Sequence, residues 1–300
     1  VEAIGPPKSV KVGNIFRSEP SILSVLLSFL EPREVAAMAM TTKKTNEHIL
    51  DFPGSLTLKL SAQAFRWVAE RPEVDPGILQ NADLAVGAVE GSSTGLAETR
   101  AFCTFLNSSS SSERFRVVSL SLKFAVEVET KDSANLFFSL NASPKSIFLK
   151  ELSLAGSALD ERSFKVLLDN LKSVNLANLC ELSLAHNHGG YFGARKAVKM
   201  LNDPSYLPAL TSLSVADNEA KVAVLEYLDM RLAQRRPFLR TLDLGGNSLD
   251  LAHSDVNGYL TANQHFLSIE HLLGLDLSWN ILYDDRAVAL FRTVLPLGPI

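Results

Sequence analysis

The second half of the chain repeats one short template, and this repeat limits the possible folds more than any other feature. The template is nine residues long and occurs in five segments. Positions one, four and six are leucine or valine, and position nine is serine or asparagine. Their central leucines lie 29 to 33 residues apart: Leu152, Leu182, Leu213, Leu242 and Leu275. Such a period is typical of a solenoid, in which one unit stacks on the next. We therefore predict one elongated α/β solenoid over residues 51–300.

The alternation inside the template predicts a short strand in each repeat. In the first strong repeat, Leu152 and Leu154 would point inward, whereas Glu151, Ser153 and Ala155 would lie on the open face of the sheet. Strands stacked in this way form a parallel sheet.

Three weaker copies of the template precede the five strong ones. They are centred on Leu56, Leu84 and Val118, so eight strands fit the chain. In the third of them we expect Val118 and Leu120 to point inward and Val117 to lie on the open face.

The polar position of the template predicts a structural ladder. An amide side chain at the turn after each strand can bond backbone groups that would otherwise be buried without partners. Four repeats carry such an asparagine: Asn187, Asn218, Asn247 and Asn280.

Helical spacing of apolar residues separates the strands, with expected helices over 96–106, 160–171, 220–232 and 284–291. A repeat of about 30 residues with an outer helix resembles the ribonuclease-inhibitor type of leucine-rich repeat. The resemblance implies a horseshoe of about eight repeats, with a parallel sheet on the concave face and helices on the convex face. It also implies that the concave face binds a protein.

Residues 18–50 lack the template, and their pattern indicates short helices. A proline-led apolar segment ends in Phe-Leu-Glu-Pro, and a Val-x-x-Met-x-Met segment then runs into Lys-Lys. This arrangement is similar to an F-box, and it implies an apolar surface that binds a Skp1-like adaptor. The adaptor-binding residues would be Ile22, Leu23, Leu26, Leu27, Leu30, Val35 and Met38. The alternative is that these helices only cover the end of the solenoid.

An F-box followed by leucine-rich repeats is the order found in substrate receptors of SCF-type (Skp1-cullin-F-box) ubiquitin ligases. The expected domains are an extension over 1–17, the F-box-like segment over 18–50 and the repeats over 51–300. The alternative is a structural or scaffold subunit of a larger assembly with no ubiquitin role. The partner-binding residues of the concave face would be Glu151, Ser153, Glu181, Ser183, Ser212, Ser214, Thr241, Asp243, Asp276 and Trp279.

Composition and motifs argue against other classes of function. A net charge of −4 provides no excess of cations for nucleic acid. No apolar run reaches the length of a membrane span, and the N-terminus lacks the pattern of a secretory signal. Two distant cysteines favour the reducing cytoplasm or nucleus. The chain has no phosphate loop, nucleophile elbow or metal-protease motif, so we expect no enzyme, cofactor or metal, and His186 and His188 lack further ligands nearby.

Overall fold

The computed structural model describes about half of the chain, including all eight strands of its sheet. The described residues are 57–62, 65–66, 83–87, 96–108, 116–124, 130–171, 174–221, 238–249 and 272–281. The N-terminal extension and the F-box-like segment lie outside these ranges, as do most of the expected helix over 220–232 and all of that over 284–291. The seven adaptor-binding residues therefore stay predictions.

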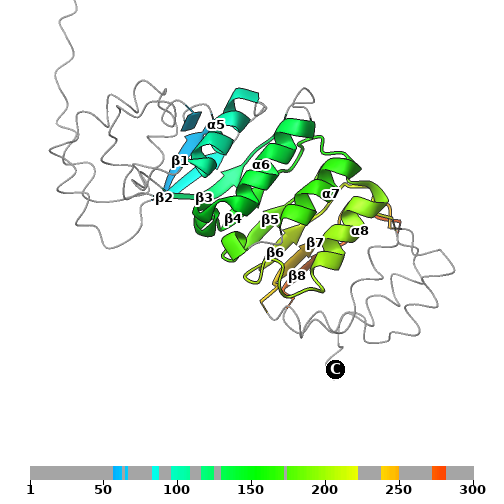
Figure 1. The fold of residues 1–300 in the computed structure, drawn as a ribbon. Helices are drawn as coiled ribbons and strands as arrows, with labels where there is room; N and C mark the ends of the chain where they lie inside the picture. Colours follow the sequence, from blue (N-terminus) through cyan, green and yellow to red (C-terminus); the bar gives the residue numbers. More distant parts are fainter. Residues whose placement is uncertain are drawn as a thin grey trace, which may run out of the picture.

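A single parallel sheet runs through the described part of the chain, and its strands follow one another in sequence order (Figure 1). One strand per repeat, with each strand beside the next one in the sequence, is the topology of a solenoid, so the predicted α/β solenoid of leucine-rich-repeat type is confirmed. The strands are β1 (Thr57–Ser61), β2 (Asp83–Gly87), β3 (Arg116–Ser121), β4 (Glu151–Ser153), β5 (Glu181–Ser183), β6 (Ser212–Ser214), β7 (Thr241–Asp243) and β8 (Gly274–Asp276).

The register of β4 to β8 follows the sequence template. Leu152 is paired with Leu182, and the pairing continues through Leu213 and Leu242 to Leu275. The first four of these leucines are at most 2% exposed, as expected for inward positions. The template leucines thus form one continuous inward row.

The predicted register of β3 is wrong by two residues. Leu120, and not Val118, is paired with Leu152 in β4. The apolar alternation fits either register, because Val118 and Leu120 lie two residues apart. A separate irregularity lies in the pairing of β2 with β3, where Leu84 faces Val117 but the next residue of β2 faces Ser119. The extra residue, Val118, reverses the alternation in the first half of β3. Val117, expected on the open face, is consequently buried.

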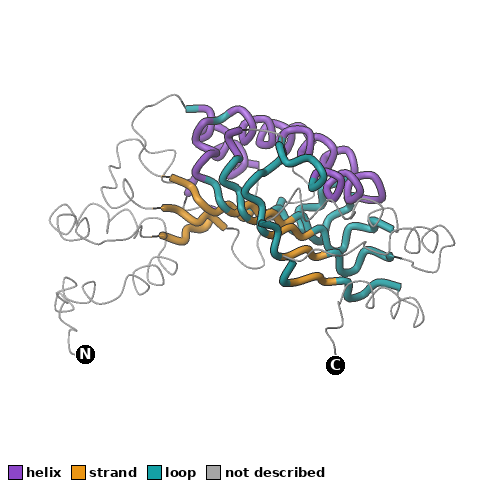
Figure 2. Tube along the Cα trace, turned by 90° about the horizontal axis from the view of Figure 1, so that it is seen from below, coloured by secondary structure: helices purple, strands orange, loops and turns teal. Residues whose placement is uncertain are grey.

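Within the described ranges, four α-helices form a second layer on the outer face of the sheet (Figure 2). The expected helices over 96–106 and 160–171 are present at those places. The helices are α5 (Leu96–Asn107), α6 (Thr130–Ala142), α7 (Glu161–Asn170) and α8 (Gly190–Met200), with short 3-10 helices at Pro144–Phe148 and Val174–Leu176.

The start of α7 shows how the sequence sets a helix boundary. The side chain of Asp160 accepts a hydrogen bond from the backbone N–H of Ser163 at 2.8 Å. This bond satisfies one of the amides that a helix leaves unpaired at its first turn. Bonds from Ser163 lower the pKa of the Asp160 carboxyl, so the cap is charged at neutral pH.

The hydrophobic core lies between the two layers. The inward leucines of the sheet meet the apolar faces of the helices, where Phe164, Leu167 and Leu168 of α7 are at most 1% exposed. Burying each such side chain stabilises the fold by roughly 1.5 to 3 kcal/mol. Among the described helices, none is long and apolar enough to cross a membrane.

Candidate protein-binding surface

The open face of the sheet carries the predicted partner-binding residues in two rows. Register places the first residues of β4 to β8 side by side, and the third residues form a parallel row. We call this surface the concave face. Its predicted residues are exposed at Glu151, Glu181, Thr241 and Asp276, and half-buried at Ser153, Ser183, Ser212, Ser214 and Asp243.

Two neighbouring carboxylates stand at one end of the first row. Glu151 of β4 is the register partner of Glu181 of β5, and adjacent strands lie about 4.8 Å apart. Neither side chain forms a hydrogen bond or ion pair with any other described residue. Both carboxylates are therefore available to a cationic group from outside the chain.

The acidic residues at the other end of the concave face are held by hydrogen bonds from their own turns and, for Asp243, also from the neighbouring strand β6. Asp243 accepts hydrogen bonds from the Ser214 hydroxyl at 2.7 Å and from the Gly245 backbone N–H at 3.0 Å. Asp276 accepts from the Ser278 backbone N–H at 2.8 Å, and bonds from Ser278 lower the pKa of the Asp276 carboxyl. These side chains are thus held in place before any partner arrives, which lowers the entropic cost of binding.

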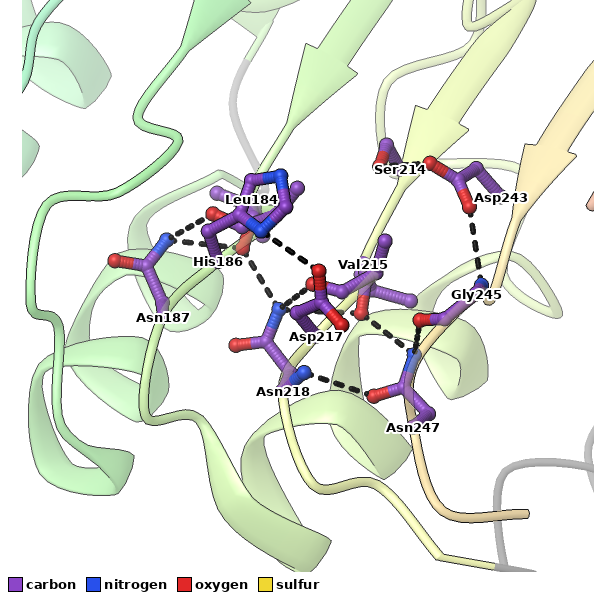
Figure 3. A network of polar contacts seen from close by, with 12 residues as sticks. Leu184, His186, Asn187, Ser214, Val215, Asp217, Asn218, Asp243, Gly245 and Asn247 are labelled. Atoms are coloured by element: carbon purple, nitrogen blue, oxygen red, sulfur yellow. Dashed lines mark hydrogen bonds and ion pairs between the residues drawn. The ribbon is translucent and has the colours of Figure 1, made fainter. Parts of the chain in front are cut away.

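Further along each repeat, the predicted asparagine ladder is present, and three of its four members, Asn187, Asn218 and Asn247, are buried (Figure 3). The Nδ2 atom of Asn218 donates to Leu184 of the preceding repeat and to Val215 of its own repeat, at 2.8 and 3.1 Å. Its Oδ1 atom accepts from the Gly189 backbone N–H at 3.2 Å. Asn247 makes the equivalent contacts one repeat later. The ladder holds the turns rigid beneath the binding surface.

The residue before each ladder position has a left-handed backbone. This position, which we call the rim, has φ between 49° and 64° in all five strong repeats. The conformation lets the rim N–H bond the next repeat, as Gly156 does with the Ala185 carbonyl at 2.9 Å and His186 does with Ala216 at the same distance. The five rim residues are Gly156, His186, Asp217, Gly246 and Trp279.

Glycine at two rim positions makes room for a neighbouring side chain. A Cβ added to Gly246 would lie 1.6 Å from Oδ1 of Asp217, so no larger residue fits there without moving that carboxylate. On its other side, Asp217 Oδ2 lies 2.7 Å from His186 Nδ1 (Figure 3). The rim therefore displays a preformed polar pair of a histidine and an aspartate.

Trp279 is the most exposed large apolar side chain on the rim. It is 92% exposed, with φ of 57°, on the turn after β8. The template predicts that Trp279 lies on the same edge of the sheet as His186 and Asp217, and the structure has all three at the rim position. The left-handed backbone was missed, although glycine at Gly156 and Gly246 in the same template position was a signal for it.

Within the described ranges, no group of three or more histidine, cysteine, aspartate or glutamate side chains could hold a metal ion. His186 instead contacts Asp217, and His188 forms an isolated backbone bridge with Asp160 just before α8.

Comparisons with known proteins found no matching family model and no matching curated protein. Among solved structures, the crystal structure of a TLR13–ssRNA13 complex is similar, with a TM-score of 0.36 and 16% sequence identity. The similar region covers 75% of this chain and 29% of that chain, so this chain spans less than a third of that protein's length.

Proposed function

We propose that the chain is a non-enzymatic adaptor that binds a partner protein on its concave face. The observation that carries this proposal is the pair of exposed carboxylates, Glu151 and Glu181, on a sheet whose own backbone groups are bonded strand to strand. A sheet face whose backbone groups are already bonded and whose carboxylates are unpaired is suited to binding a cationic partner.

The chemistry of the concave face indicates the kind of partner. The small residues beside the carboxylates, which are serine, alanine and glycine, allow a helix or loop to approach closely. The carboxylates favour a lysine or arginine on the partner and disfavour phosphate, since like charges repel. Trp279 at the rim provides an aromatic anchor of the type that dominates many interfaces. A basic protein segment fits these features best.

The finer proposal concerns the ubiquitin system. The F-box-like segment over 18–50 would bind a Skp1-like adaptor, and the repeats would hold the substrate of an SCF-type ligase. Support comes from the sequence resemblance and from the order of the two segments along the chain.

Binding to purified Skp1-like adaptor tests the finer proposal. Leu27→Asp places a charge in the predicted apolar surface and should abolish binding to the adaptor, because burying the charge without a partner is costly. Unchanged circular dichroism would show that the repeats remain folded. Wild-type adaptor binding by Leu27→Asp would refute the docking proposal while leaving the concave-face proposal intact.

Charge reversal tests the concave face. The double variant Glu151→Lys/Glu181→Lys should lose stoichiometric partners in affinity purification from cell extract. The variant Glu127→Lys/Glu129→Lys is a matched control, because it changes net charge equally at residues outside β4 to β8 and outside the five strong repeats. Equal loss of partners in both variants would show that net charge, and not the concave face, drives binding.

A second candidate is a scaffold subunit without a ubiquitin role. It is favoured by one observation: no open-face residue of β4 to β8 is aromatic or arginine, the types that supply most hot spots. A fixed set of copurifying subunits without any ligase component would support the scaffold. A stoichiometric Skp1–cullin pair would exclude it.

A further inference from the structure

A groove lined by residues of α7 and α8 lies on the helical layer of the solenoid, and its volume is about 1010 Å³. The helices α7 and α8 cover the face of the sheet opposite to the concave face (Figure 2). The two helices are neighbours in Figure 1, and Gly193 of α8 lies against Phe164 of α7. A Cβ added to Gly193 would be 3.1 Å from the Phe164 Cβ, so glycine here permits close approach of the helices.

Positive charge predominates in the lining of this groove. Five cations face three carboxylates, whereas the chain as a whole has a net charge of −4. The five cations are Arg162, Lys165, Arg195, Lys196 and Lys199.

The contacts of these groups show which charges are available. Asp160 already caps α7, and Lys196 forms an ion pair with Asp169. The side chains of Arg162 and Lys165 are exposed and form no hydrogen bond or ion pair within the described part of the chain. Arg162 and Lys165 can therefore bind an anionic group of a partner without breaking an existing hydrogen bond or ion pair.

An apolar component accompanies the charge. Leu168 and Met200 line the groove as buried side chains, and Phe192 at its wall is 61% exposed. Exposed apolar surface beside cations is typical of a site that binds an amphipathic segment rather than a bare anion.

We propose that the α7–α8 groove binds an acidic segment of a partner protein that also carries aromatic or aliphatic side chains. Its carboxylates pair with Arg162 and Lys165, and its apolar side chains contact Phe192. A peptide is favoured over a nucleic acid because the groove contains aliphatic side chains, and because the net negative charge of the chain opposes a polyphosphate. This inference does not depend on the concave face, which carries charge of the opposite sign.

Fluorescence anisotropy with a labelled synthetic peptide tests the proposal on the full chain. The probe is a short peptide of glutamates interrupted by two phenylalanines. Comparison probes are the same peptide with glutamine for glutamate, polyglutamate without phenylalanine, and single-stranded RNA of similar length. We expect the first probe to bind most tightly, with affinity falling as salt rises from about 0.05 to 0.3 M, because salt screens exposed charges. Tighter binding of the RNA would overturn the proposal.

Variants localise the binding. Arg162→Glu/Lys165→Glu should weaken peptide binding at least about tenfold, since two attractive contacts become repulsive. Phe192→Ala should weaken the phenylalanine peptide but leave polyglutamate unchanged. The control Lys123→Glu/Lys150→Glu makes the same charge change at exposed residues outside the groove. Equal weakening by the control, or undiminished binding by the first variant, would overturn the proposal, as would absence of peptide binding by the folded wild-type chain.

Discussion

Truncation of one ladder asparagine provides a quantitative test of how the repeats are held together. Asn247 has no exposed surface, and its Oδ1 atom accepts from the backbone N–H groups of Asn218 and Ala220 at 3.0 and 3.2 Å. Its Nδ2 atom donates to the carbonyls of Val215, Leu244 and Gly245. Asn247→Ala removes all five bonds and leaves a cavity that is closed to solvent.

The cost of this change depends on which partners keep another bond. Each of the three carbonyls retains a donor: Asn218 Nδ2 for Val215, Asn280 Nδ2 for Leu244 and the Asp217 N–H for Gly245. The two backbone N–H groups lose their acceptor. An unsatisfied buried N–H costs about 1 to 3 kcal/mol, so Asn247→Ala should lower the free energy of unfolding by about 2 to 6 kcal/mol.

Asn280→Ala is the matched comparison. Asn280 also accepts from two backbone N–H groups, at 2.9 and 3.0 Å, and donates to three carbonyls. It is only partly buried, so water can replace several of these bonds, and the loss should be about 1 kcal/mol. Urea unfolding followed by circular dichroism measures both free energies. Equal losses for the two variants would refute the argument that burial decides the cost.

Substitutions at other positions test the rim, the exposed tryptophan and the helix cap separately. Gly246→Ala should lower the free energy of unfolding by about 1 to 3 kcal/mol, because it strains a left-handed backbone and displaces the carboxylate of Asp217, whereas Gly87→Ala, with no atom within 4 Å of the new Cβ, should cost less in the same urea titration. Trp279→Gly should weaken partner binding in a pull-down without lowering the melting temperature, since the side chain is almost fully exposed and its backbone is left-handed; a lower melting temperature would argue for a packing role. The lowered pKa of Asp160 means that the charged cap stabilises the fold above the usual carboxyl range and that this contribution is lost as pH falls through the folded pKa. Asp160→Asn should therefore flatten the fall in stability below about pH 4, and an unchanged pH profile from acid titration of the variant would contradict this.

The repeat template contains most of the information needed to predict the fold. Leucines spaced as in Leu149, Leu152 and Leu154 determine which strand face is buried, and the polar residue three positions later determines the turn. The carboxylate pair of the concave face was also predictable, since equivalent positions of successive repeats must lie side by side in a parallel sheet.

Features that depend on contacts between distant residues were not predictable. The burial of Val117 arises from one extra residue, Val118, in the pairing of β3 with β2, and a degenerate template cannot reveal such an irregularity. The α7–α8 groove combines cations from two helices about 30 residues apart in sequence, and none of them belongs to a motif. The polar contact of His186 with Asp217 likewise requires the left-handed rim to bring the two side chains together.

The ladder also gives the array a direction. Asn187 accepts from the N–H groups of Ser157 and Leu159 in the repeat before it, and Asn247 does the same for the repeat of Asn218. The turn of each repeat is therefore locked by the repeat that follows it, and no ladder oxygen bonds forward in the described repeats. Local opening of one repeat should accordingly release the turn on its N-terminal side before the turn on its C-terminal side. We therefore expect such a solenoid to unfold more readily from one end of the array than from the other.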